Sequence, residues 1–416
     1  MTYKCIKKSH HSRKGAALAL AAMVVVIMLL AGMALLRVGL NSRVYANKTV
    51  NELIARSAAD AGLNEAFSLM QKKLATSHLP GNSWNNSTLP STTDRTLDAS
   101  DATYSYAVSG SPINGFVIAS TGECSGQQRT VNVSITTQTP FTGIGVREVI
   151  DIKTGVNFYK TPEDGLFILR TNSSETGCIS INSWVTVPGD VVIGPGGIPE
   201  TSIDTKSNTV IEGGSYSATE EINFPPVYAP SGLPLMEYQQ GNTITLNSSG
   251  QYEGITIGNG ETLMIDDGVP GTTKKLTIYI SGDLILNNGA SMILAEGTAL
   301  DLYLGGNWED KNSSSAGGFF NENTISDPIT AAQLLHVYGL PGCEKISFKA
   351  KSDFAGAVYA PDADLILHNS GDIYGAFVGN NFEMKNSSSF TYVADLMNGM
   401  IDDPITVFAR QRWWED

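Results

Sequence analysis

Two adjacent carboxylates, Asp266 and Asp267, are candidates for acid–base chemistry on a glycan. Glycosidases place two carboxyl groups about 5–10 Å apart across the scissile bond. This pair stands in an Asp-Asp-Gly segment, where aspartate commonly accepts hydrogen bonds from turn amides. Turn formation therefore accounts for both residues, and we expect the chain not to be an enzyme. A polysaccharide lyase or glycoside hydrolase is the alternative.

Other chemistries have less support in the sequence. The remaining candidates are three histidines beyond the basic N-terminus and three cysteines: His78, His336, His368, Cys124, Cys178 and Cys343. The histidines lie in unrelated contexts, and no Cys-x-x-Cys pair indicates zinc. Three cysteines cannot all pair within one chain, although one disulfide can form in an oxidising compartment. The sequence predicts no metal and no other cofactor.

The first 36 residues predict a membrane anchor. Residues 1–15 form a leader with five Lys or Arg and no acidic residue, and residues 16–36 are uncharged. Such a run of 21 residues spans about the 30 Å of a bilayer core. Because basic segments stay in the cytoplasm, we expect a single-pass inner-membrane protein with its N-terminus cytoplasmic. Most of the chain would then be periplasmic or extracellular.

Composition excludes a nucleic-acid partner. The formal net charge is −14, and it becomes more negative without the basic leader. Such a chain repels nucleic acid. The 42 glycines and only 16% charged residues favour a turn-rich β protein.

Helical periodicity continues beyond the anchor. Apolar residues recur at three- and four-residue intervals at Val50, Leu53, Ile54, Ala58, Ala61, Ala66, Phe67, Met70 and Leu74. No proline occurs before Pro80, so the pattern predicts one helix from about residue 16 to about residue 75. Residues 16–36 would form its transmembrane half and residues 37–78 its amphipathic half. A signal anchor followed by a linker helix is the alternative.

The N-terminus resembles type IV pilin-like proteins, and especially the PilX-type minor pilin and pilus-assembly group. The resemblance rests on the junction 13–18, the uncharged run and the alanine-rich segment 56–66, and it covers about 75 residues. It implies that a prepilin peptidase cuts after Gly15 and methylates the new N-terminal Ala16. It also implies other pilin-like subunits as partners.

Leu20 departs from most major pilins of this family, which carry Glu at the fifth mature position. The resemblance implies that this Glu pairs with the amino terminus of a neighbouring subunit. An unpaired charge in an apolar filament core would be costly. Leu20 therefore favours a minor or tip subunit, and PilX-type sequences commonly lack the Glu as well.

Residues 79–145 predict a small antiparallel sheet that packs on the amphipathic helix. After an Asn/Ser/Thr/Pro-rich loop, strand-like runs occur at 104–108, 116–120 and 131–136. The expected turn Ser120-Thr121-Gly122 and the following Arg129-Thr130-Val131 strand resemble segments of pilin-like proteins.

Residues 146–396 predict a β-solenoid, with an insertion near 307–330 and a C-terminal segment over 397–416. Runs of three to five apolar-rich residues alternate with Gly- and Asn-rich turns. Such short units cannot bury a core alone, so stacking into a parallel β-helix-like domain is favoured. A β-sandwich is the alternative. The expected fold class is thus α+β, then mostly β.

Two segments in this region, 353–363 and 371–379, are similar to a β-solenoid module fused to PilX-type N-termini in bacterial envelope proteins. The resemblance assigns no catalytic residue to that module. The chain as a whole is therefore expected to be a non-enzymatic structural protein of a type IV pilus or related secretion system. Its solenoid head would serve adhesion by binding a surface glycan or protein. A membrane-anchored β-helix enzyme or binding protein acting on polysaccharide is the alternative.

Overall fold

A computed structural model describes residues 14–75, 84–85, 87–111, 114–267, 274–312, 317–325, 327–349, 353–368, 371–385, 388–398 and 405–415. The expected leader before residue 14, and residues 79–83 and 86 of the loop expected over 79–100, lie outside these residues. Part of the described remainder of that loop forms a strand, Ser91–Thr96. The chain divides into two compact units. The first combines residues 1–70, 83–135 and 410–416, and the second combines 71–82 and 136–409.

Helix α1 (Lys14–Ala75) is continuous over 62 residues, which confirms the predicted long helix. Its apolar side chains from Leu18 to Leu40 are exposed, and it is long and apolar enough to cross a membrane. Farther along, small and apolar residues are buried at Ala55, Ala58, Ala59, Gly62, Leu63, Ala66 and Met70. Val50 and Leu53 fit the helical period but are exposed, so the buried stripe begins later than the sequence indicates.

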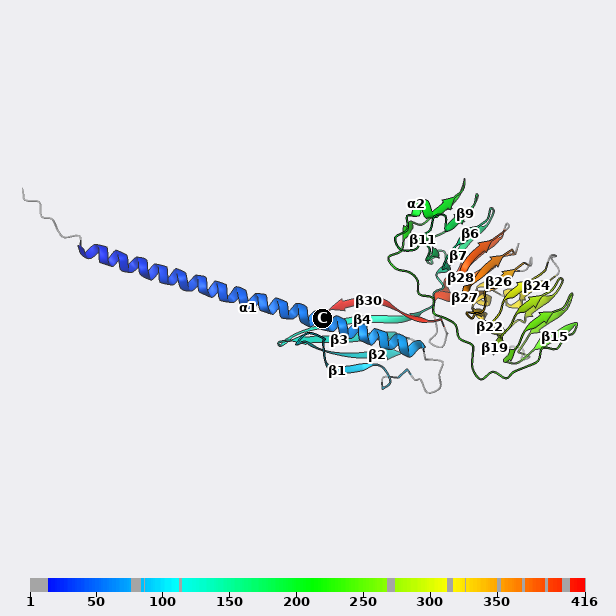
Figure 1. The fold of residues 1–416 in the computed structure, drawn as a ribbon, viewed down its shortest axis with the longest axis horizontal. Helices are drawn as coiled ribbons and strands as arrows, with labels where there is room; N and C mark the ends of the chain where they lie inside the picture. Colours follow the sequence, from blue (N-terminus) through cyan, green and yellow to red (C-terminus); the bar gives the residue numbers. More distant parts are fainter. Residues whose placement is uncertain are drawn as a thin grey trace, which may run out of the picture. The chain divides into compact units, whose positions relative to one another are not determined.

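The buried stripe of α1 packs on a five-stranded sheet (Figure 1). The strand order is β1 (Ser91–Thr96), β2 (Thr103–Ser111), β3 (Gly115–Cys124), β4 (Gln127–Gln138) and β30 (Val407–Glu415). The first four strands are antiparallel neighbours, and β2, β3 and β4 correspond to the three predicted strands. The sequence did not indicate β1, which is polar and mostly exposed, or the pairing of β30 beside β4.

Helix and sheet approach most closely at glycines. A Cβ atom on Gly122 would lie 1.9 Å from the carbonyl oxygen of Ala55, and one on Gly62 would lie 2.5 Å from Ser120 Oγ. Ser120-Thr121-Gly122, expected as a turn, instead lies inside β3. Gly122 is required there because the helix backbone rests directly on the strand.

The second unit is built from short strands in two arrays. The first array contains β5 (Gly143–Val146), β6 (Ile150–Ile152), β7 (Asn157–Thr161), β8 (Ile168–Thr171), β9 (Ile179–Ile181), β10 (Thr186–Val187), β11 (Asp190–Ile193), α2 (Pro199–Ser202), β12 (Ile203–Thr205), β13 (Val210–Ile211) and β14 (Ser215–Ser217). A strap of residues 218–242 then leads to the second array.

The second array begins with β15 (Thr243–Leu246), β16 (Gly250–Tyr252), β17 (Ile255–Ile257), β18 (Thr262–Ile265), β19 (Lys274–Ile280), β20 (Leu284–Leu286), β21 (Ser291–Leu294), β22 (Thr298–Leu304), β23 (Trp308–Asp310) and β24 (Gly318–Asn321). It continues through η1 (Glu322–Ile325), α3 (Pro328–Leu334), β25 (Leu335–Gly339), β26 (Lys345–Phe348), β27 (Phe354–Leu367), β28 (Ile373–Met384), β29 (Ser389–Val393) and η2 (Ala394–Met397).

The strand pairings between rungs of this unit are parallel, as in the pairs β19–β22, β22–β25 and β27–β28. Apolar side chains alternate inward, as Leu276, Ile278 and Ile280 do along β19. This architecture confirms the predicted parallel β-helix-like solenoid, and the β-sandwich alternative is wrong. The rungs are visible as successive arrows in Figure 1.

The stacking order of the rungs differs from their order in the sequence. The first rung pairs with the last long strand, since Ile144 of β5 is in register with Phe377 of β28, and Ile150 of β6 with Phe382. The first array then continues away from β28 to β14, and the second array away from β28 to β16. The two arrays therefore meet in the middle of one continuous stack.

A row of aromatic rings crosses this junction. Neighbouring ring centroids lie 4.8–5.7 Å apart along Trp308, Phe348, Phe354, Phe377, Phe390 and Phe158. Trp308, at 0% exposure, is the largest of the fully buried side chains. The same core thus extends from one array into the other.

The stretch expected as an insertion near 307–330 contributes to the stack instead. Strand β23 pairs with β20 and β26, and β24 pairs with β21. The sequence obscures this because these strands have only three or four residues and are separated by a polar Lys-Asn-Ser-rich stretch.

The two chain segments that enter and leave the solenoid lie side by side within the second unit. The Thr139 amide donates to Met397 O at 3.0 Å, and the Thr139 hydroxyl donates to Leu396 O at 2.7 Å. The Tyr392 hydroxyl donates to Phe141 O at 2.8 Å. In chain order, the solenoid is thus inserted between the neighbouring strands β4 and β30.

Substitution of Gly122 tests the close helix–sheet contact. Gly122→Ala should destabilise the sheet unit by about 1–3 kcal/mol, because the added methyl overlaps the α1 backbone. Hydrogen exchange of β3 amides in the full chain, held in detergent micelles, measures the change. Glu123→Ala is the matched control, since Glu123 is exposed on the same strand. Equal protection in both variants would contradict the packing described.

Candidate functional site

The predicted processing residues Gly15 and Ala16 lie within the first turn of α1. Leu20 follows them on the same helix and is 66% exposed. The fifth position after the predicted cleavage point is therefore an exposed apolar surface. Whether cleavage occurs remains a prediction.

Asp266 and Asp267, the speculative catalytic pair, follow strand β18. Asp267 is only 8% exposed, and its carboxylate accepts a 3.1 Å hydrogen bond from the Lys274 amide. The Asp267 amide contacts Thr298 Oγ1 at 3.3 Å, and the Asp266 amide donates to Leu246 O at 3.0 Å. These contacts join the pair to other backbone segments of the solenoid. The turn interpretation stays a prediction, since the segment continues into residues outside those described.

The structure brings together Asp301 and His336, which the sequence had left in unrelated contexts. They are in register on β22 and β25, with Asp301 Oδ1 3.3 Å from His336 Nδ1 and Oδ2 2.6 Å from Lys275 Nζ. Burial raises the pKa of Asp301, but the His336 hydrogen bond and the Lys275 charge outweigh it and hold that pKa below its usual value. The arrangement is a charge-balanced ion pair on the solenoid wall.

The strap (residues 218–242) runs along the solenoid wall and lines two surface pockets. The Arg170 guanidinium donates to Glu220 O at 2.7 Å, and the Tyr359 hydroxyl donates to Pro225 O at 2.7 Å. Burial raises the pKa of Tyr359 well above its usual value, so this donor keeps its proton. At the other end, Leu235 forms a parallel bridge with Gln251 of β16. The strap thus contacts rungs of both arrays.

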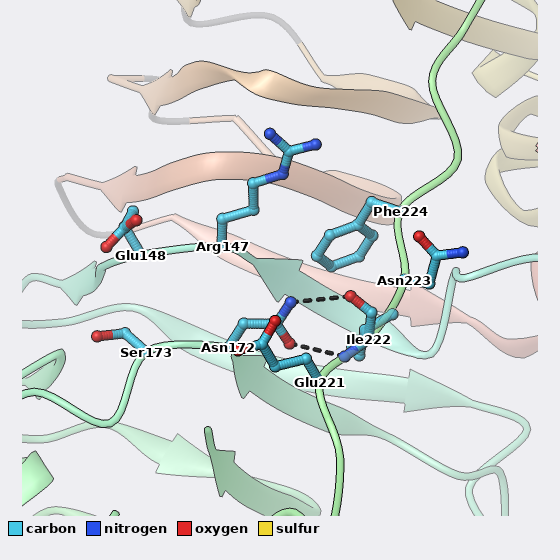
Figure 2. Close-up of a pocket in the computed structure, with 8 residues that line it drawn as sticks. All are labelled: Arg147, Glu148, Asn172, Ser173, Glu221, Ile222, Asn223 and Phe224. Carbon is cyan, nitrogen blue, oxygen red and sulfur yellow. Dashed lines mark hydrogen bonds between the residues drawn. The ribbon is translucent and has the colours of Figure 1, made fainter. Parts of the chain in front are cut away.

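A pocket of about 370 Å³ lies where the strap crosses β5 and β8 (Figure 2). It is lined by Arg147, Glu148, Asn172, Ser173, Glu221, Ile222, Asn223 and Phe224. The Asn172 side chain donates to Ile222 O and accepts from the Ile222 amide, both at 2.9 Å, as the dashed lines in Figure 2 show. The side-chain amide of Asn172 thus pairs with the strap backbone as a neighbouring strand would, and it holds the strap in place.

The pocket offers polar recognition around one aromatic ring. Phe224 is buried, and its ring lies over Gly145, where a Cβ would stand at an ordinary contact distance of 3.7 Å from the ring atoms. Arg147 forms an ion pair with Asp362, which leaves the carboxylates of Glu148 and Glu221 to dominate the charge of the pocket. Among the described residues, this arrangement suits binding of a polar ligand.

Sequence reasoning did not identify this pocket, because the strap has neither helical nor strand periodicity. The available signal was its run of prolines at Pro225, Pro226, Pro230 and Pro234. Proline favours an extended chain that needs no backbone partner. Such a segment can cross many rungs and pair with the sheet at one point, as Leu235 does with Gln251.

The three described cysteines, Cys124, Cys178 and Cys343, are all buried and free. No disulfide therefore joins them, which settles the alternative left open by the sequence. The described residues also contain no group of three or more His, Cys, Asp or Glu that could hold a metal ion.

A family model described as a domain of unknown function (DUF7305) matches residues 237–399. A search of curated proteins finds no match. The crystal structure of the competence-associated pilin ComZ from Thermus thermophilus is similar at 11% identity, covering 88% of this chain and 98% of that chain, with a TM-score of 0.21. At this TM-score the similarity carries no argument, so the proposal below depends on the chain's own features.

Asn172→Ala should release the strap near the pocket. The change removes two hydrogen bonds to Ile222, and loss of buried partners typically costs about 1–3 kcal/mol. Hydrogen exchange at the Ile222 amide should accelerate, while β8 amides beyond the contact remain protected. Ser173→Ala is the neighbouring control. Unchanged exchange at Ile222 would contradict the anchoring role.

Cys343 should resist alkylation in the native protein. Burial raises the pKa of its thiol to about 12, so almost no reactive thiolate exists at pH 8. Iodoacetamide followed by peptide mass mapping should find Cys343 unmodified before unfolding and modified in urea, where its pKa returns to about 8.5. Equal modification rates in both states would show that the site is open to solvent.

Proposed function

We propose that this chain is a non-enzymatic, pilin-like structural subunit of a type IV pilus or a related secretion or assembly system. It would occupy a minor or tip position and display its β-solenoid for adhesion or surface interaction. The observation that carries the proposal is the position of the solenoid in the chain. It is inserted between β4 and β30, which are neighbours in the sheet that packs on α1.

An insertion at this place leaves the helix–sheet unit complete. The described chain enters the solenoid after β4 and returns as β30, so the sheet keeps all five strands. The helix–sheet unit can then act in assembly while the solenoid acts in display. Termini that lie close together are what allow one domain to be inserted in another.

The exposed N-terminal half of α1 supports membrane storage and later packing among similar helices. Its apolar side chains from Leu18 to Leu40 have no cover within the described chain. A single-pass inner-membrane location, with the N-terminus cytoplasmic and the bulk periplasmic or extracellular, follows from the basic leader. Leu20 lacks the carboxylate that a repeating subunit would offer its neighbour, which favours the minor or tip position.

A prepilin peptidase and other pilin-like subunits are the proposed partners. The proposal also includes no catalytic role. It is supported by Asp266 and Asp267, whose backbone amides and, for Asp267, carboxylate take part in local hydrogen bonds.

Substitution of Gly15 tests the processing step. In wild-type cells the mature chain should begin at Ala16, as measured by intact mass and N-terminal peptide analysis. Gly15→Leu should retain the leader and remove the protein from surface filaments, because the bulky side chain obstructs the peptidase.

Gly39→Ala provides the control in the same helix, since a Cβ at Gly39 meets nothing within 4 Å. That variant should be processed and assembled normally. A wild-type chain that keeps its leader in cells, or filaments that form equally well with Gly15→Leu, would overturn the proposal.

A further inference from the structure

One corner of the solenoid carries a tryptophan where neighbouring rungs carry other residues. The corner between β9 and β10 is equivalent to those between β6 and β7 and between β12 and β13, because the flanking strands are in register. Its third residue is Gly155, Trp184 or Asn208 in successive rungs, with φ of 81°, 66° and 62°. All three adopt the left-handed conformation that glycine and asparagine tolerate best.

Trp184 has no packing role that would explain this choice. Its side chain is 68% exposed, whereas the buried Trp308 is 0% exposed. A bulky residue at positive φ is strained, and such strain persists where function favours the residue. The corner therefore holds an aromatic ring outward at a conformational cost that Asn or Gly would avoid.

The corner residues of the Trp184 rung and of the next rung carry hydroxyl and amide side chains. The Asn182 side chain donates to Ile152 O at 3.2 Å, and the Thr209 hydroxyl donates to Asn182 O at 2.9 Å. Ser183 Oγ and Ser207 Oγ lie 3.5 Å apart across the two rungs. These contacts tie the corner to the rungs on either side, so the ring is presented from a pre-organised platform.

Charge around this corner is neutralised locally. In one adjacent rung Lys153 forms an ion pair with Asp151, and in the other Lys206 pairs with Asp204 at 2.6 Å. The rung of Trp184 has the uncharged Ser180 and Asn182 at the equivalent positions. An anionic or cationic ligand would find no uncompensated charge there.

We infer that the Trp184 corner binds a neutral polysaccharide. The apolar face of a sugar ring stacks on an exposed aromatic ring, and sugar hydroxyls pair with the hydroxyl and amide groups around it. A protein partner would instead need a wider apolar patch around the tryptophan. On the two flanking rungs, Val210 of β13 is 50% exposed and Tyr159 of β7 is 55% exposed, and both lie on the strands beyond the corner itself. The inference rests on the proposed display function and names the ligand class for that display.

The test uses the purified full chain in detergent micelles and measures its depletion from solution by chitin and by microcrystalline cellulose. Alginate gel is the anionic control. Wild-type protein should bind at least one neutral polysaccharide and not alginate. Trp184→Asn should weaken that binding about tenfold or more, since aromatic anchors dominate such contacts. It should also unfold at an equal or higher temperature, because Asn tolerates the left-handed conformation.

Two further variants separate stacking from general effects. Trp184→Tyr should retain part of the affinity because it keeps an aromatic ring. Tyr228→Ala should bind as wild type does, since Tyr228 is equally exposed at 70% but lies on the strap. Absence of wild-type binding to both polysaccharides, or undiminished binding by Trp184→Asn, would overturn the inference. A lower unfolding temperature for Trp184→Asn would overturn it too, by showing that the ring is a packing residue.

Incorporation into surface filaments tests the assembly proposal separately. Trp184→Asn should enter surface filaments as wild type does, because the substitution leaves α1 and its sheet unchanged. Lost binding with intact filaments supports the ligand site. Filaments without polysaccharide binding by the wild type overturn the ligand site alone, and absence of the wild type from filaments overturns the assembly proposal.

Discussion

The parallel backbone ladder between rungs is the constraint on which the solenoid depends. A single rung of strands cannot enclose a core, so each rung must share both hydrogen bonds and apolar contacts with its neighbours. The pairing of β5 and β6 with β28 applies this constraint between distant parts of the chain. Without that junction, each array would expose the end of its core, including the rings of Phe158 and Phe390.

A second constraint, the close contact of α1 with β3, governs the helix–sheet unit. Small residues on the helix and Gly122 on the strand let the two backbones meet with almost no side chain between them. Exposed apolar residues precede this region on the same helix. Helix α1 therefore has an exposed apolar segment followed by a segment that packs on the sheet. The pairing of β30 with β4 then returns the end of the chain to this unit.

The sequence predicted what local patterns determine. Period-3.6 apolar spacing identified α1, and short apolar runs between glycine-rich turns identified the solenoid. It did not predict that the first rung pairs with the last, because the register between Ile144 and Phe377 depends on contacts more than 200 residues apart in sequence. For the same reason the pairing of β30 with β4 was missed. His336 was not expected beside Asp301, because their contact depends on the register between β22 and β25.

For the candidate sites too, the sequence indicated what depends on local patterns and did not indicate what depends on contacts between distant segments. The turn role predicted for Asp266 and Asp267 stays a prediction, because the Asp-Asp-Gly segment continues into residues outside those that the structure describes. The pocket lined by Phe224 was missed because its other residues follow β5, follow β8 or belong to the strap, three segments that no spacing rule connects. Trp184 gave no signal either, because only the register of successive corners shows that it occupies a position held by Gly155 and Asn208.

The length of the strap is tied to the length of the solenoid head. It must reach from the end of the first array to the far end of the second, since it begins after β14 and its Leu235 meets β16. A new rung inserted at either outer end would lengthen the stack by about 4.8 Å, which one to two further extended strap residues could cover. The junction of β5 with β28, where the chain enters and leaves, would not change. The length of the head can therefore vary in evolution independently of its attachment, provided that the strap grows with it.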